Sequence, residues 1–283
     1  MPGTVTIVTD STAYLPVGLA EELGITVVPL HVVLNGASGV EGVDVTPDDL
    51  ARALAERRTT VTTSRPSPQD FIGTYRRLLA DGASGIVSVH LSSELSGTWD
   101  AARMASVECG SGVVRVVDSR TAAMGLGFAV LAAAEAAGSG ATLDDVEAIA
   151  ERTVDRTVTL FYVDTLEHLR RGGRIGAAQK WVGTALSVKP ILHVVGGRIV
   201  PLEKVRTAGK ALARLEELAV TAAGAVTVDV AVQHLAAADK AAALSERLKA
   251  RLPDLRRLYA SEVGAVVGAH VGPGLIGVVV VRR

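Results

Sequence analysis

The stretch that decides the fold reads GIVSVH at residues 85–90 and continues as LSSELSGTW at residues 91–99. The first part is an apolar run that predicts a buried strand, and residues 98–107 are typical of a helix. Ser93 and Ser96 therefore lie, with other hydroxyl side chains, in a turn between a strand and a helix. Hydroxyls, free backbone N–H groups and the positive end of a helix dipole together favour anion binding. We expect an anion site in this turn.

Polar residues also end two other predicted strands. The strand at residues 4–9 ends in Asp10-Ser11, and the strand at residues 113–117 ends in Asp118-Ser119. Helices are predicted between the strands, and this alternation favours an open, mostly parallel sheet. Ligands bind such sheets beyond the carboxyl ends of the strands. Each polar pair alone could be a helix N-cap, but three such ends favour a site.

Three segments of the first half are less regular. Residues 25–33 predict a strand in which Pro29 indicates an edge position or an irregularity. Residues 35–44 are rich in glycine and predict a loop. Residues 59–68, with four threonines, two serines and two prolines, are too polar for a core strand and are also expected to be a loop.

The second half mixes helices with a hairpin around Gly196-Gly197, which is typical of an α+β layer. We therefore predict a two-domain α/β protein. Its first domain, residues 1–155, has the parallel sheet and a Ser/Thr-rich site, and its second domain, residues 156–283, has the α+β fold. His270 lies in an apolar context that resembles a strand.

The composition excludes several classes of function. The 283 residues include 29 basic and 30 acidic side chains, so no overall field favours nucleic acid or a membrane surface. Aromatic residues make up only 3% of the chain, which leaves few platforms for stacking bases. Cys109 is the one cysteine, and the six histidines show no paired ligand spacing, so we expect no disulfide and no metal. We expect no secretory signal, no membrane insertion and a cytoplasmic location.

Motifs for nucleotide or acyl-transfer chemistry are missing from the sequence. It contains no phosphate-binding loop, no dinucleotide fingerprint and no nucleophile elbow. Gly125 and Gly127 lie in a helical pattern and indicate close helix packing. The basic turn at residues 170–174 is, taken alone, a solvated helix end. A hydrolase that uses Ser93 or Ser96 with His270, oriented by Asp10 or Asp118, is an alternative that the residues leave open.

Seven blocks together resemble the DegV family, and they span the chain in the family's order. They are IVTDSTAYLP at 7–16, TTSRPSPQDF at 62–71, LSSELSGTW at 91–99, VVDSRTAAMGLG at 116–127, RRGGRIGAAQKWVGTALSVKP at 170–190, KVRT at 204–207 and AHVGPG at 269–274. The resemblance implies a monomeric carrier that binds a long-chain fatty acid and presents it to a separate fatty acid kinase. The kinase forms an acyl phosphate for phospholipid synthesis.

The resemblance also implies which residues bind. Thr63 and Ser64, with Ser93, Ser96 and His270, are expected to hold the fatty acid carboxylate, with no cofactor. Arg174 and Arg206 are expected near the face that meets the kinase. This chain departs from the family pattern at Arg65, where glutamine is usual, and so adds a charge beside the site.

The residue chemistry is compatible with such a ligand. Hydroxyls and turn N–H groups can hold a monocarboxylate without an obligatory cation. The chain is 48% apolar and rich in small aliphatic residues, which can form a tunnel for the acyl tail within or between the two domains. Burial of about 14 methylenes at ~0.8 kcal/mol each gives roughly 11 kcal/mol, against a few kcal/mol from headgroup hydrogen bonds. We expect the tail to supply affinity and the hydroxyls to supply orientation.

Overall fold

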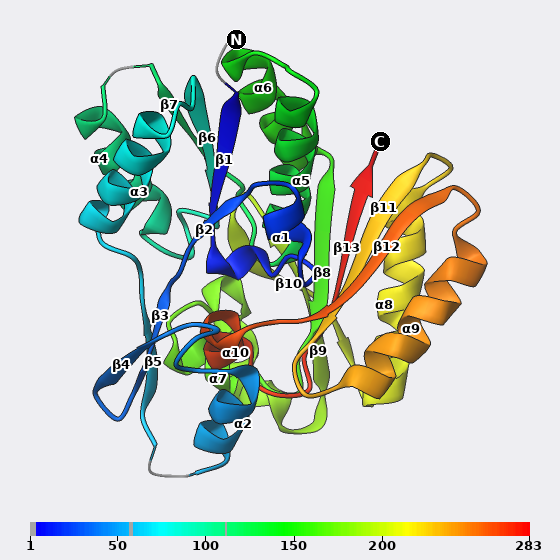
Figure 1. Ribbon diagram of the computed structural model, residues 1–283. Helices are drawn as coiled ribbons and strands as arrows, with labels where there is room; N and C mark the ends of the chain where they lie inside the picture. The colour runs from blue at the N-terminus through cyan, green and yellow to red at the C-terminus, as the bar shows by residue number, and fades with distance from the viewer. Residues whose placement is uncertain (1–3, 57–58, 111) are drawn as a thin grey trace. The chain divides into compact units, whose positions relative to one another are not determined.

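Two structural units make up the chain in the computed structural model (Figure 1), which describes residues 4–56, 59–110 and 112–283, without the side chains of 182–187. The first unit comprises Met1–His31 and Ser64–Asp155, and the second comprises Val32–Thr63 and Arg156–Arg283. The predicted boundary after residue 155 coincides with a division between the units. The segment Val32–Thr63 differs from the prediction, because it belongs to the second unit.

The first unit is built on a parallel sheet, as its strand–helix alternation predicts. Its order is β2 (Thr26–Val28), β1 (Val5–Asp10), β6 (Gly85–His90) and β7 (Val114–Asp118). All six residues of β6 are buried, which explains its mainly apolar character. The predicted strand over residues 25–33 is interrupted after Val28, at Pro29, and β2 is an edge strand.

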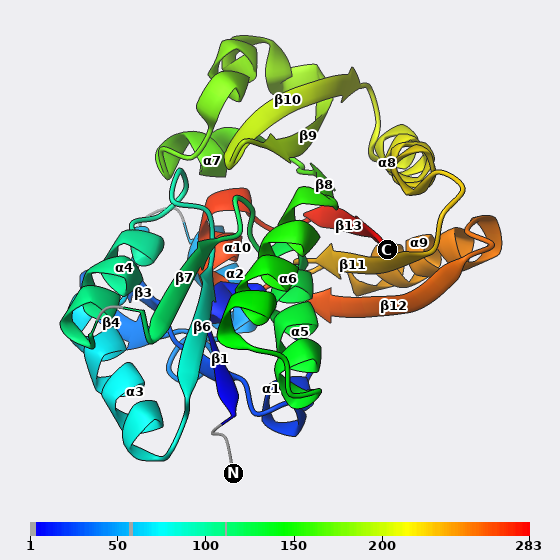
Figure 2. The same ribbon diagram turned by 90° about the horizontal axis from the view of Figure 1, so that it is seen from above.

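Helices cover both faces of this sheet (Figure 2). The helices α3 (Pro68–Ala80) and α4 (Thr98–Glu108) pack on one face, and α5 (Met124–Gly138) and α6 (Leu143–Asp155) on the other. Nearly all of α5 is buried, because it packs on β1 and β6 of the sheet and also on its neighbour α6. A Cβ at Gly127 would lie 2.9 Å from the carbonyl oxygen of Ala13, so this glycine permits the close helix packing that the sequence indicates.

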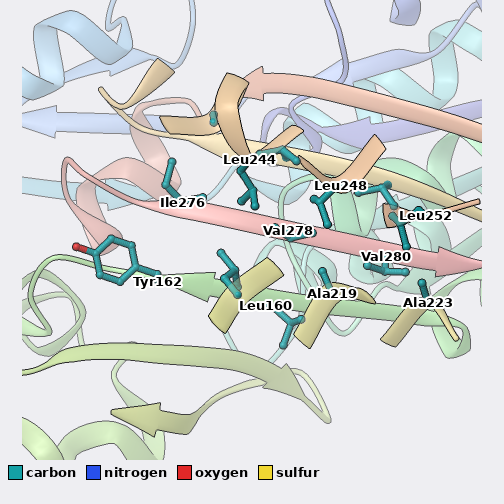
Figure 3. Packing of buried hydrophobic residues seen from close by; sticks show 14 of the residues in the cluster. Leu160, Tyr162, Ala219, Ala223, Leu244, Leu248, Leu252, Ile276, Val278 and Val280 are labelled. Carbon is teal, nitrogen blue, oxygen red and sulfur yellow. The ribbon is translucent and has the colours of Figure 1, made fainter. Parts of the chain in front are cut away.

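The second unit has a six-stranded mixed sheet, as expected for an α+β layer. Its order is β10 (Arg198–Val205), β9 (Lys189–Val195), β8 (Thr157–Tyr162), β13 (Ile276–Arg282), β11 (Val228–His234) and β12 (Leu255–Glu262). Neighbouring strands are antiparallel except for the parallel pair β11 and β12. The helices α8 (Ala208–Ala223) and α9 (Ala238–Arg251) cover one face. Figure 3 shows Leu160, Val278 and Val280 of this sheet packed with Leu244 and Ala219 of the helices.

A small three-stranded sheet lies in the second unit, in the order β4 (Ala37–Val40), β3 (His31–Leu34) and β5 (Val61–Ser64). The predictions of loops at residues 35–44 and 59–68 are therefore wrong in part. Polarity argues against a core strand but not against an edge strand, and the β-branched threonines suit half-exposed β5.

The helix α2 (Pro47–Ala55) joins the segment Val32–Thr63 to the rest of its unit, because it packs on α10 (Ala265–Val271). A Cβ at Gly268 would lie 2.5 Å from a methyl group of Leu50, so the two helices approach closely. The backbone N–H of Val266 also donates to Glu41 Oε1 at 2.7 Å. These contacts explain why the segment belongs with a part of the chain more than 200 residues away.

His270 lies on α10, so the strand-like context expected for it is wrong. A short apolar run does not distinguish a strand from a buried helix turn. The remaining short elements are η1 (Ser11–Ala13), α1 (Leu19–Glu22), α7 (Glu167–Arg171) and the 3-10 helix η2 (Gly176–Ser187). Within the described residues, no helix has the length and apolar character needed to cross a membrane.

Candidate functional site

Two of the residues predicted to bind the fatty acid carboxylate, Thr63 and His270, are in contact in the second unit. Thr63 lies on β5 and His270 on α10, and Thr63 Oγ1 is 2.9 Å from His270 Nε2. The two residues are 207 positions apart in the sequence. The contact depends on the packing of the segment Val32–Thr63 against the unit that contains α10.

The imidazole of His270 is neutral at physiological pH. Burial, together with the nearby positive charge of Arg174, lowers the pKa of His270 to about 4. Arg174 Nη1 donates to the carbonyl oxygen of Gly172 at 2.6 Å, and this bond holds its guanidinium close to the site. An anion here therefore meets a neutral ring and a separate cation.

Burial of His270 Nδ1 assigns the tautomer of the ring. Nδ1 is buried and has no hydrogen bond partner within the described part of the chain. A buried N–H without an acceptor is rarer and costlier than a buried lone pair, so we assign the proton to Nε2. Nε2–H then donates to Thr63 Oγ1. The Thr63 hydroxyl keeps its own proton, which it can donate to a ligand.

A pocket of about 390 Å³ opens beside this pair. It is lined by Leu54, Thr59, Thr60, Val61, Thr62, Thr63, His168, Arg171, Gly172, Arg174, Ala269 and His270. This lining contains two arginines and no carboxylate. Arg171 is paired outside the lining with Glu167, which also pairs with Arg170, so the basic turn is partly neutralised. The guanidinium groups and threonine hydroxyls of this lining can bind the anionic end of a ligand.

The predicted serines lie in the first unit. Ser93 Oγ donates to Asp118 Oδ2 at 2.7 Å, so its hydroxyl proton is committed to a carboxylate. Ser96 Oγ is 2.9 Å from Thr98 Oγ1 and accepts from the Thr98 N–H. When Thr98 is the donor in the hydroxyl pair, Ser96 can donate to a ligand.

The other predicted residues are on the surface. Ser64 is exposed and donates to the carbonyl oxygen of Arg65 at 3.3 Å. Arg206 is exposed directly after β10. Its exposure leaves the Arg206 side chain accessible to another protein.

A buried hydrogen-bonded chain supports the start of the serine-rich turn, and the sequence gives little sign of it. Tyr75 donates to Ser88 Oγ at 2.8 Å, Ser88 Oγ lies 2.7 Å from His90 Nε2, and His90 Nδ1 lies 3.0 Å from Asp10 Oδ2. Asp10 also accepts from the N–H of Leu91 at 3.0 Å. The spacing of Ser88 and His90, two residues apart on one face of β6, was the available signal.

The described residues contain no group of three or more His, Cys, Asp or Glu side chains that could hold a metal ion. The polar groups of the site are hydroxyls, a neutral imidazole and guanidinium groups. The hydroxyls and guanidinium groups can donate hydrogen bonds to an anion, whereas the Nε2–H of His270 is directed at Thr63. The fold and the site together define a two-unit α/β protein with a pocket lined by hydroxyl, imidazole and guanidinium groups.

Comparisons with known proteins agree with this class. The family model for the DegV family matches residues 4–283. A DegV domain-containing protein of Streptomyces coelicolor is 59% identical over 279 residues, which cover 99% of each chain. The chain therefore belongs to the DegV family.

Solved structures of family members have the same fold. A Thermus thermophilus DegV family protein, reported with its fatty acid binding, has a TM-score of 0.94 and 37% identity, with 99% of this chain and 100% of that chain covered. Bacillus subtilis DegV, a fatty acid binding protein, has a TM-score of 0.89 and 33% identity over 99% of this chain and 100% of its own. Both comparisons confirm the predicted family and fold class.

Proposed function

We propose that this chain binds a long-chain fatty acid and presents its carboxylate to a partner fatty acid kinase, which forms an acyl phosphate for phospholipid synthesis. The observation that carries the proposal is the Thr63–His270 pair, with Oγ1 and Nε2 at 2.9 Å beside a basic pocket. The fatty acid binding of the Thermus and Bacillus relatives supports the choice of ligand. The chain itself is a carrier and not an enzyme, and it needs no cofactor, since the chemistry belongs to the kinase.

Neutral donors suit a carboxylate that must later react. The Thr63 hydroxyl can donate to one carboxylate oxygen while His270 holds its Oγ1 in place. A hydroxyl bond orients one carboxylate oxygen without transferring a proton to it, so this oxygen stays available to attack a phosphoryl donor. The His270 ring stays neutral because burial, with a smaller contribution from the charge of Arg174, lowers its pKa. The charge of Arg174 also attracts the anion to the pocket.

The three predicted serines differ in how well each can donate a hydrogen bond to the headgroup. Ser96 is favoured over Ser93, because Ser93 already donates its proton to Asp118. Ser64 follows Thr63 directly in the chain and is a further candidate donor. These three serines are assigned by the family resemblance, and substitution is the test for each of them.

Kinase docking is the second part of the proposal. Arg174 and Arg206 are the residues we expect at the contact surface, since guanidinium groups bind acidic surfaces and phosphates well. Charge reversal at Arg206, which is exposed, tests docking apart from the pocket. We also expect a cytoplasmic monomer, and light scattering of the purified carrier checks its mass.

Native mass spectrometry is the direct test of the ligand. We expect the purified protein to carry a mass equal to one long-chain fatty acid, and complete absence of such a mass under native conditions would contradict the proposal. Thr63→Val, which keeps the shape but removes the hydroxyl, should slow acyl phosphate formation by a kinase. Thr63→Ser should restore it. Thr221→Val, on the exposed face of α8, is the matched control.

A further inference from the structure

We propose that Arg65 supplies a cation to the fatty acid headgroup at the turn of residues 91–99, and that it makes this chain favour ionised acids over neutral lipids. The inference rests on the function proposed above. It gives Arg65, which is not among the headgroup donors proposed above, a role in determining ligand specificity.

Arg65 contacts the turn of residues 91–99 within the first unit. Its Nη1 donates to the carbonyl oxygen of Gly97 at 3.1 Å. Gly97 lies between Ser96 and Thr98, whose hydroxyls are 2.9 Å apart. The guanidinium therefore lies at the turn that contains the favoured serine donor.

Gly97 makes this contact possible. A Cβ at Gly97 would lie 1.8 Å from Arg65 Nη1 and 3.2 Å from its Cδ, so the guanidinium and the end of its stem lie against the glycine backbone. The Gly97 carbonyl also accepts the N–H of Ala101 in the first turn of α4. Any larger residue at Gly97 would displace the arginine from the turn.

The charge of Arg65 is uncompensated in the described part of the chain. No ion pair joins it to a carboxylate there, whereas Arg115 pairs with Asp144 and Arg120 with Asp155 in the same unit. A guanidinium has five N–H donors, and the bond to Gly97 uses one. The remaining donors can meet a second acceptor.

A carboxylate is the ligand group that suits this cation best. The planar guanidinium matches the two oxygens of a carboxylate, and a charged hydrogen bond is stronger than a neutral one. Ser96 and Thr98 contribute dipoles but no charge, so they bind the hydroxyl of a fatty alcohol nearly as well. Arg65 is the group at this turn that distinguishes the acid from the alcohol.

The test compares two ligands on matched proteins. The dissociation constants of palmitic acid and of hexadecanol are measured for the wild type, Arg65→Gln, Arg65→Lys and Arg76→Gln, at low and high salt. Arg76 is an exposed arginine on α3 and serves as the control. We expect Arg65→Gln to weaken acid binding by about five- to tenfold at low salt, with a smaller effect at high salt, and to leave hexadecanol binding unchanged. Arg65→Lys should keep part of the preference, and Arg76→Gln all of it.

Each other outcome overturns the inference in a recognisable way. Equal weakening of acid and alcohol binding would mean that Arg65 only holds the turn in shape. An unchanged acid affinity, with or without a slower kinase reaction, would remove Arg65 from the headgroup site. A wild type that binds neither ligand would refute the proposed function itself, whereas a wild type that binds both with Arg65→Gln unaltered would refute the role of Arg65 alone.

Discussion

Gly172 leaves no space for a side chain beside His270, since a Cβ there would lie 2.1 Å from Nδ1 of the ring. Gly172 has a φ of −74°, which alanine adopts without strain. Gly172→Ala should therefore act through the ring alone. It should displace His270 from Thr63 and slow acyl phosphate formation severalfold, as a kinase assay would measure, at a cost of about 1–3 kcal/mol in the free energy of unfolding.

Gly209→Ala is the control for this substitution. Gly209 lies in α8 of the same unit, and a Cβ there meets nothing within 4 Å. Alanine should leave the kinase reaction unchanged and raise helix stability slightly. If Gly172→Ala proved as harmless as Gly209→Ala, the placement of His270 would not matter for presentation of the acid.

The stability of the protein should depend on pH through His270. Its pKa is 6.5 when exposed and about 4 in the folded chain, so between these values the unfolded state binds a proton that the folded state does not. As the pH drops from 6.5 towards 4, the free energy of unfolding should thus fall by about 3 kcal/mol because of His270. Above pH 6.5, His270 should make the free energy of unfolding no more dependent on pH. Urea unfolding of the wild type and of His270→Gln across this range measures the contribution as their difference. If the free energies of unfolding of the two proteins changed with pH in the same way, this contribution of His270 would be excluded.

Local patterns predict the first unit well. The apolar strand at residues 85–90 and the polar strand ends are features of contiguous residues, and a parallel sheet places such ends along one edge. The placement of the segment Val32–Thr63 could not be predicted in this way. It depends on contacts such as Glu41 with Val266, which are 225 residues apart.

The contacts within the candidate site could likewise not be predicted from local sequence patterns. The motifs indicate Thr63 and His270, but their 2.9 Å contact follows from the packing of α2 on α10. Threonines at residues 59–63 look like a loop because polarity does not distinguish an edge strand from a loop. The need for a glycine at Gly172 is likewise visible only when the ring of His270 is in place.

Asp10 should be important for stability, although no ligand contact is assigned to it. Its fully buried carboxylate accepts hydrogen bonds from His90, from the N–H of Leu91 and from Thr12. Asp10→Asn replaces an acceptor by an amide donor among these donors and should cost about 2–4 kcal/mol in urea unfolding. Asp81→Asn, at the exposed end of α3, should change stability by less than about 0.5 kcal/mol. Similar losses for both variants would contradict the importance of the buried chain.

Ser93 should be unreactive towards a fluorophosphonate probe. Its hydroxyl donates to Asp118, and the histidine that a hydrolase would need, His270, has its Nε2 on Thr63. A serine without an imidazole base is not activated as a nucleophile. Labelling detected by intact-mass spectrometry should be absent for the wild type. Stoichiometric labelling that is lost in Ser93→Ala or Ser96→Ala would favour the hydrolase instead.

Loss of the headgroup donors should separate retention of the fatty acid from its phosphorylation. In Thr63→Ala with Ser96→Ala, only a few kcal/mol of headgroup hydrogen bonds are removed, whereas burial of about 14 methylenes contributes roughly 11 kcal/mol. The double variant should therefore still copurify with fatty acid, as native mass spectrometry would show. Its carboxylate is no longer oriented, so the rate of acyl phosphate formation by the kinase should fall at least tenfold. A variant that loses its fatty acid completely but phosphorylates added acid at the normal rate would show the opposite division, with the hydroxyls needed for affinity and not for orientation.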